Sequence, residues 1–125
     1  MPQLSNDQLI SIANEYGTPV YVYHAERITE QYAKLKEAFR ESDTRIFYAG
    51  KALNNINILK HIRSLGCDID CSSVNEVHMA VKAGLEPKNI LYISNGIAFS
   101  EIEEALRVSV NANIACRSTL RNSGK

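Results

Sequence analysis

Residues 45–53 read Arg-Ile-Phe-Tyr-Ala-Gly-Lys-Ala-Leu, and this stretch gives the clearest indication of the fold. Its first five residues are rich in aromatic and β-branched side chains and predict a short buried strand. After Asn54-Asn55, apolar residues recur at helical spacing from Ile58 to Leu65. Lys51 is therefore expected at the carboxyl end of a strand in a strand–helix unit, which is where α/β folds bind ligands. A lysine there is either a solvated charge or an amine held for an electrophile.

The same alternation of strand and helix continues on both sides of this stretch. Further strands are predicted at residues 19–23, 68–71, 90–93 and 113–116. Helices are predicted to begin at capping boxes, which pair Ser5 with Gln8, Ser73 with Glu76, and Ser100 with Glu103. Apolar stripes predict the inner faces of the first two helices, namely Leu9, Ile12, Ala13 and Tyr16, then Ile28, Tyr32, Leu35 and Phe39 within a helix at 26–41.

This alternation indicates an α/β protein with a parallel sheet and right-handed crossovers. Two architectures fit it: an open doubly wound sheet, or part of a (β/α)8 barrel. No Gly-x-Gly-x-x-Gly follows a strand, so nothing supports a dinucleotide-binding fold. A complete barrel needs about 250 residues, and this chain has 125.

Composition narrows the class of protein. The 14 basic residues balance the 14 acidic ones, so no basic stripe indicates a nucleic-acid partner. No run is long enough to span a membrane, and the polar N-terminus lacks a signal-peptide core, which predicts a cytoplasmic protein. The three cysteines lack a Cys-x-x-Cys pair, which argues against a zinc site or a disulfide framework. Cys67 and Cys71 are expected to be buried, reduced thiols.

Three further polar residues fall near the predicted position of Lys51. Asp70 lies on the next strand, and in a sheet with neighbouring strands in register it comes close to Lys51. A carboxylate there favours the charged form of the lysine, although an exposed acid at a strand end is the alternative. Glu76 is explained by helix capping without any chemistry. Asn95 borders the same end of the third strand or simply forms a turn with Gly96.

Several motifs, in one order, resemble the pyridoxal-phosphate-dependent decarboxylases with an alanine-racemase-like barrel, above all the diaminopimelate decarboxylase branch. The lysine motif is Tyr-Ala-Gly-Lys-Ala-Leu at residues 48–53, and Gly-Thr-Pro-Val-Tyr-Val-Tyr at 17–23 precedes it. The match continues through residues 65–77 and 83–90 and through Ser-Asn-Gly at 94–96. Spaced motifs in a fixed order are far more specific than any one of them.

The resemblance implies the N-terminal portion of a (β/α)8 barrel, incomplete, with pyridoxal 5'-phosphate as cofactor. Lys51 is then the catalytic lysine that bonds to the cofactor aldehyde, and Asp70 lies beside it as a second catalytic residue. Glu76 and Asn95 join Lys51 and Asp70 in binding the cofactor. The implied reaction converts meso-diaminopimelate to L-lysine, and the full-length family implies a homodimer.

The resemblance also implies the domain limits: an N-terminal helix and lead-in strand at residues 1–23, a partial barrel at 24–116, and a divergent or truncated tail at 117–125. The chain shows no glycine-rich phosphate loop and no Glu-Pro-Gly segment for the pyridine nitrogen. The isolated chain is therefore expected to be inactive. Ornithine, arginine or carboxynorspermidine decarboxylation, a non-catalytic cofactor-binding barrel, and an inert fragment remain as alternatives.

Overall fold

The computed structural model describes residues 4–94, 98–108 and 113–116. Its elements are, in order, α1 (Asn6–Tyr16), α2 (Ala25–Ala38), β1 (Phe47–Ala49), η1 (Gly50–Ala52), α3 (Ile56–Ser64), β2 (Asp68–Cys71), α4 (Val74–Lys82), η2 (Pro87–Asn89), β3 (Ile90–Ser94), α5 (Phe99–Val108) and β4 (Asn113–Cys116). Within these residues, no helix has both the length and the apolar character needed to cross a membrane.

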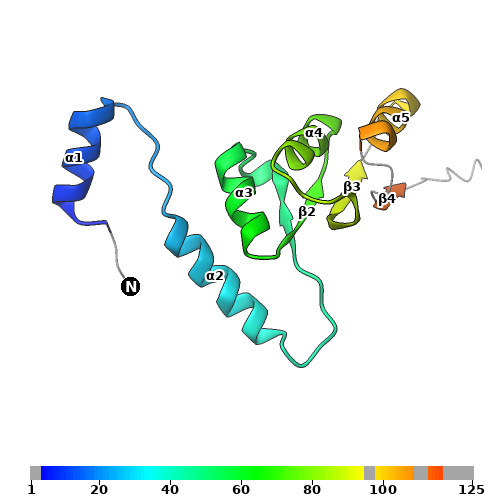
Figure 1. Cartoon of the computed structure of the whole chain (residues 1–125), viewed down its shortest axis with the longest axis horizontal. Coiled ribbons are helices and arrows are strands. Elements are labelled where there is room, and N and C mark those ends of the chain that lie inside the picture. The colour runs from blue at the N-terminus through cyan, green and yellow to red at the C-terminus, as the bar shows by residue number, and fades with distance from the viewer. Residues whose placement is uncertain (1–3, 95–97, 109–112, 117–125) are drawn as a thin grey trace, which may run out of the picture.

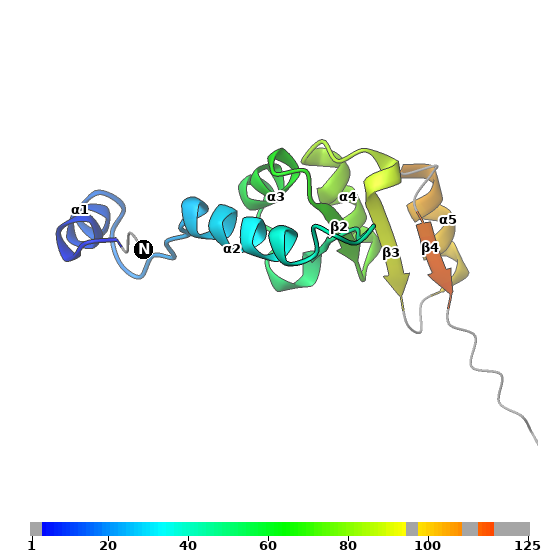
Figure 2. The ribbon, with the colours of Figure 1, turned by 90° about the horizontal axis from the view of Figure 1, so that it is seen from below.

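The four strands form one parallel sheet in the order β1-β2-β3-β4. Tyr48 pairs with Ile69, and Ile69 in turn pairs with Ile90, so neighbouring strands step evenly across the sheet. Helices α3, α4 and α5 lie side by side along one face of it (Figures 1 and 2). The predicted parallel β/α architecture is confirmed. In the described residues β1 and β4 are the two edges, so the sheet is open, and α3, α4 and α5 all cover one face (Figure 2), as in part of a (β/α)8 barrel.

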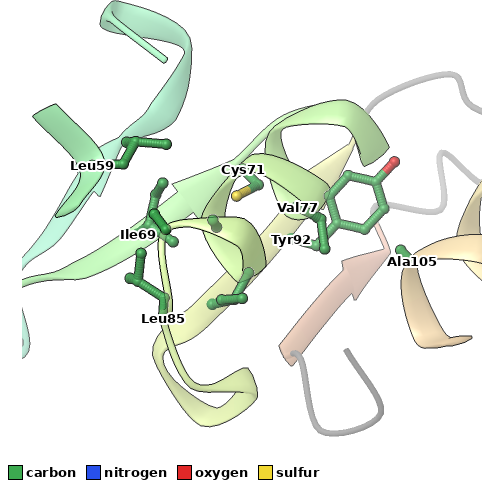
Figure 3. Packing of buried hydrophobic residues seen from close by; sticks show 10 residues of the cluster. Leu59, Ile69, Cys71, Val77, Leu85, Tyr92 and Ala105 are labelled. Atoms are coloured by element: carbon green, nitrogen blue, oxygen red, sulfur yellow. The ribbon is translucent and has the colours of Figure 1, made fainter. Parts of the chain in front are cut away.

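The main hydrophobic core lies between the sheet and α4 (Figure 3). Ile69 and Cys71 from β2 and Ile90 and Tyr92 from β3 are almost completely buried there, against Val77 of α4. Burying each large side chain of this kind stabilises the fold by roughly 1.5–3 kcal/mol. Alternation along β2 therefore points Ile69 and Cys71 into the core and leaves Asp68 and Asp70 on the opposite face.

The two cysteines that the structure describes in detail are free and buried, as expected. Burial raises the pKa of the Cys71 thiol to about 12, with the nearby carboxylates of Glu76 and Asp70 adding to the shift. The Cys67 thiol contacts the Ile46 and Asp68 carbonyl oxygens, and burial raises its pKa as well. Both thiols therefore remain protonated at neutral pH and behave as small apolar side chains.

Local signals set most of the helix boundaries. The Ser5 hydroxyl accepts from the Gln8 amide at 3.2 Å, while the Gln8 side chain accepts from the Ser5 amide at 2.8 Å. This reciprocal pair completes the predicted capping box. Gly17, Gly66 and Gly84 follow the ends of α1, α3 and α4 with positive φ, a conformation that glycine adopts without steric cost.

The predicted inner face of the first helix is covered only in part, at Ile12 and Ala13, which are half-buried. Figure 1 shows α1 apart from the sheet, and none of its residues is buried; Tyr16 remains 69% exposed. The strand predicted at residues 19–23 is wrong, because this segment runs without pairing to any strand in the described residues and leaves Tyr21 87% exposed. An apolar stripe or an alternation creates a buried surface only where another element covers it.

Two helix limits also differ from prediction. Helix α2 ends at Ala38, not at residue 41. Only the first half of its apolar stripe packs against the fold, and the side chains of Leu35 and Phe39 remain about half exposed. Helix α5 begins at Phe99, so Ser100 lies inside it and the predicted Ser100–Glu103 box is absent. Instead, the Glu101 carboxylate accepts from the Ala98 amide at 3.0 Å. Another acid in the first turn thus provides the cap.

Candidate functional site

Lys51 lies in the tight turn η1, directly after β1 ends at Ala49. The sequence predicted Lys51 at the carboxyl end of this strand, and the structure places it there, within the turn that follows β1. The Tyr48 hydroxyl donates to the Leu53 carbonyl oxygen at 3.0 Å and closes the turn. The Lys51 side chain is exposed. Its amine is thus free to meet a molecule that approaches this end of the sheet.

Asp70 lies beside this turn because Ala49 of β1 pairs with Asp70 of β2. Burial raises the pKa of the Asp70 carboxyl, Lys51 opposes that rise, and Glu76 adds to it. The structure therefore brings Lys51 and Asp70 within electrostatic reach of each other, as the predicted register required. The Oδ1 atom of Asp70 is buried and has no hydrogen-bond partner among the described residues.

Asp68 shows what an ordinary acid on the same strand face looks like. Its carboxylate is 2.7 Å from the Arg45 guanidinium, which also donates to the Lys88 carbonyl oxygen at 3.1 Å and lies over the Phe47 ring. Asp68 is therefore satisfied within the fold. Asp70, two residues further toward the carboxyl end, retains a buried oxygen that a bound group could use.

Glu76 is the only buried charged residue in the part of the chain that the structure describes, at 9% exposure. Its amide donates to the Ser73 hydroxyl at 3.3 Å, as the predicted capping box requires. The carboxylate departs from that box, because it accepts from the Ser72 amide at 2.9 Å and from the hydroxyls of Ser72 and Ser73. Sequence reasoning did not single out Ser72, although the serine pair ahead of α4 was a visible signal.

Other sequence-predicted features lie elsewhere. Asn95 falls outside the described residues, so its role remains a prediction. A cavity of about 470 Å³ lies between α2 and β1 and is lined mainly by apolar side chains such as Ile28, Tyr32 and Ile46. It contains neither Lys51 nor Asp70. This apolar groove is therefore distinct from the cluster at the carboxyl ends of β1 and β2.

Comparison with known families gives a match over residues 25–122 to the pyridoxal-dependent decarboxylase, pyridoxal binding domain. The chain belongs to this family. Its fold and the position of Lys51 after β1 therefore sit within a domain that binds pyridoxal, and pyridoxal 5'-phosphate is the cofactor that the family implies. The predicted family resemblance and cofactor are confirmed.

Named relatives are diaminopimelate decarboxylases. The chain is 38% identical to that of Methanothermobacter thermautotrophicus over 113 residues, covering 89% of this chain and 26% of that protein. It is also 38% identical to the Helicobacter pylori protein over 95 residues, covering 76% and 24%. A crystal structure of the Helicobacter pylori enzyme complexed with L-lysine superposes with a TM-score of 0.77 at 32% identity, covering 86% and 28%. The chain thus spans about a quarter of the length of the curated relatives it matches.

The residues at the end of β1 and β2 fit the cofactor. An exposed amine on a tight turn can bond to an aldehyde, and the buried Oδ1 of Asp70 faces no protein donor among the described residues. Lys51 would hold the cofactor covalently, and Asp70 would lie beside the bond that holds it. Glu76 is already saturated by Ser72 and Ser73, so a direct contact with the cofactor receives no support from its geometry.

Proposed function

We propose that this chain supplies the lysine-bearing strand–helix units of a decarboxylase that converts meso-diaminopimelate to L-lysine. The observation that carries the proposal is the turn at Lys51, set beside Asp70 and its unsatisfied buried oxygen in a pyridoxal-binding domain. The named relatives support the substrate, since they are diaminopimelate decarboxylases and one was solved with L-lysine. We further propose that the decarboxylase is cytoplasmic, that it is a homodimer, and that it acts in lysine biosynthesis.

Each residue has a separate task in this function. The Lys51 amine holds the cofactor, whose conjugated ring accepts electrons when a bond at the substrate carbon breaks. The Asp70 carboxylate attracts the positively charged nitrogen of the Lys51 side chain and so holds that side chain near the end of β2. Burial and Glu76 make Asp70 hold its proton more tightly than a solvated acid does, while Lys51 opposes them.

Covalent trapping tests the assignment of Lys51. The purified chain is incubated with pyridoxal 5'-phosphate, reduced with borohydride, digested, and its peptides are measured by mass spectrometry. We expect the label on the peptide that contains Lys51 and its loss in Lys51→Ala. Lys60→Ala is the matched control, because Lys60 is an exposed lysine on α3. Label spread evenly over surface lysines, and unchanged in Lys51→Ala, would contradict the proposal.

A further inference from the structure

Glu76 reaches further back than helix capping requires. In a complete capping box the side chain of the N3 glutamate accepts from the amide of the N-cap residue, which here is Ser73. The Glu76 carboxylate instead accepts from the amide of Ser72 at 2.9 Å, one residue closer to the end of β2. In this position the carboxylate lies next to Gly50, the first residue of the neighbouring turn η1.

Gly50, which immediately precedes Lys51, lies next to this carboxylate. A Cβ atom at position 50 would lie 3.1 Å from Glu76 Oε2 and 3.2 Å from the Asp70 carbonyl oxygen. Gly50 is not among the glycines with positive φ, so its backbone conformation is open to other residues. A side chain at position 50 would therefore be tightly confined, and the Glu76 carboxylate takes up part of the space that it would need.

We propose that Glu76 is a positioning residue for Lys51: its carboxylate supports the turn Gly50–Ala52 from below and thereby fixes the point from which the Lys51 side chain projects beside Asp70. The inference rests on the proposed function, in which Lys51 holds the cofactor. It assigns Glu76 an indirect role that neither helix capping nor direct contact with the cofactor provides. Three donors hold the support in place: the Ser72 amide, the Ser72 hydroxyl, which is shared between both carboxylate oxygens, and the Ser73 hydroxyl.

The charges around Asp70 agree with this arrangement. Burial raises the pKa of Asp70 most, Lys51 on η1 lowers it, and Glu76 on α4 raises it again. The residue that pairs with Asp70 from β3 is Leu91, which carries no charge. Lys51, Asp70 and Glu76 therefore form one electrostatic unit, and a change at Glu76 reaches Lys51 both through the backbone of Gly50 and through Asp70.

A pair of substitutions tests the mechanical part. We expect Gly50→Ala to slow the borohydride-trapped capture of pyridoxal 5'-phosphate on Lys51 by about tenfold, the effect of roughly 1.4 kcal/mol. Glu76→Ala in the same chain should restore part of that rate, because it removes the nearest contact of the new Cβ, at 3.1 Å, and leaves the Asp70 carbonyl oxygen at 3.2 Å. Glu101→Gln is the matched control, since Glu101 serves the start of α5, far along the chain from η1. It should leave the capture rate unchanged.

Two cofactor-free measurements separate this proposal from the proposed function. In denaturant unfolding, Gly50→Ala and Glu76→Ala should be non-additive, with the double variant more stable than the sum of the two losses predicts. In a carbon-13 titration, assigned by loss of one signal in Asp70→Asn, Glu76→Gln should lower the pKa of Asp70. The titration does not use the Gly50→Ala variant, so it still tests the positioning role if that variant fails to fold.

Additive stability losses, no rescue of capture, or an unchanged Asp70 titration in Glu76→Gln would each overturn the positioning role and leave Glu76 as a helix cap. Failure of the unsubstituted chain to capture the cofactor on Lys51 would instead overturn the proposed function. In that case the unfolding cycle and the titration still decide whether Glu76 supports the turn at Gly50.

Discussion

Asp68 and Asp70 share one face of one strand and differ only in their neighbours. Arg45 satisfies Asp68 at 2.7 Å, whereas Asp70 combines a buried, unpartnered Oδ1 with the opposing charges of Lys51 and Glu76. A raised pKa with specific charged neighbours is characteristic of functional groups. The contrast makes Asp68 a matched control for Asp70.

At the scale of this residue, stability should depend on pH in a definite direction. The folded pKa of Asp70 lies above the ordinary value of 3.8, so the unfolded chain releases this proton first as pH rises. The free energy of unfolding contributed by Asp70 is therefore complete below pH 3.8 and falls as pH rises toward the folded pKa. Urea unfolding across this window should show that step, and Asp70→Asn should remove it.

The same substitution should affect the cofactor. We expect Asp70→Asn to reduce capture of pyridoxal 5'-phosphate on Lys51 by about tenfold, because attraction between a cation and a nearby carboxylate contributes on the order of 1 kcal/mol or more. Asp68→Asn should lose a partly exposed ion pair worth about 1 kcal/mol or less and leave capture unchanged. Equal losses of capture in both variants would remove Asp70 from the site.

At the scale of the elements, a histidine joins α2 to α3. The Nε2 atom of His61 lies 2.9 Å from the Thr29 hydroxyl and 3.1 Å from the Ala25 carbonyl oxygen. Ile28 and Tyr32 add apolar contacts beside it, against a small cluster around Ile62. The first half of α2 is therefore attached to α3 both by hydrogen bonds and by apolar packing.

His61→Ala should lower the free energy of unfolding by about 1 kcal/mol, the usual net value of such hydrogen bonds. Amide hydrogen exchange should become faster across residues 25–38, because α2 loses its polar attachment. His78→Ala provides the comparison: His78 pairs with Glu104 at 3.0 Å on the surface, where both side chains are largely exposed. If both variants behave alike, the attachment of α2 does not depend on His61.

At the scale of the whole molecule, the described sheet leaves much apolar surface uncovered. Beta strands β1 and β4 are its edges, Ile93 is 38% exposed on the face away from the helices, and the apolar groove between α2 and β1 stays open. Exposed edges and apolar surface favour association between chains. The purified chain should therefore sediment as species larger than its 13.9 kDa mass.

We also expect this chain alone to release no carbon dioxide above free pyridoxal 5'-phosphate from diaminopimelate, ornithine or arginine. The cofactor ring accepts electrons effectively only when the protein holds its phosphate and its ring nitrogen. By resemblance to the family, a glycine-rich loop and a Glu-Pro-Gly segment do this, and neither is found in these 125 residues. Release above the cofactor blank that Lys51→Ala abolishes would show that the described units suffice.

The sequence alone specified the strand–helix order from residue 45 onward, the parallel sheet, the caps at Ser5 and Ser73, and the position of Lys51 at a strand end. These features follow from periodicity and from contacts within about four residues, which are written locally in the chain. Motif order added the family and the cofactor. The domain limits and the role of Asn95 remain predictions.

Only the tertiary structure decided the rest. The exposed stripe of α1, the redirected carboxylate of Glu76 beneath Gly50, and the attachment of α2 through His61 each depend on which residues meet across distant parts of the chain. Such meetings are fixed by strand register and helix packing, and a one-dimensional pattern carries no record of them. An apolar stripe shows which side of a helix can be buried, and the fold decides whether anything covers it.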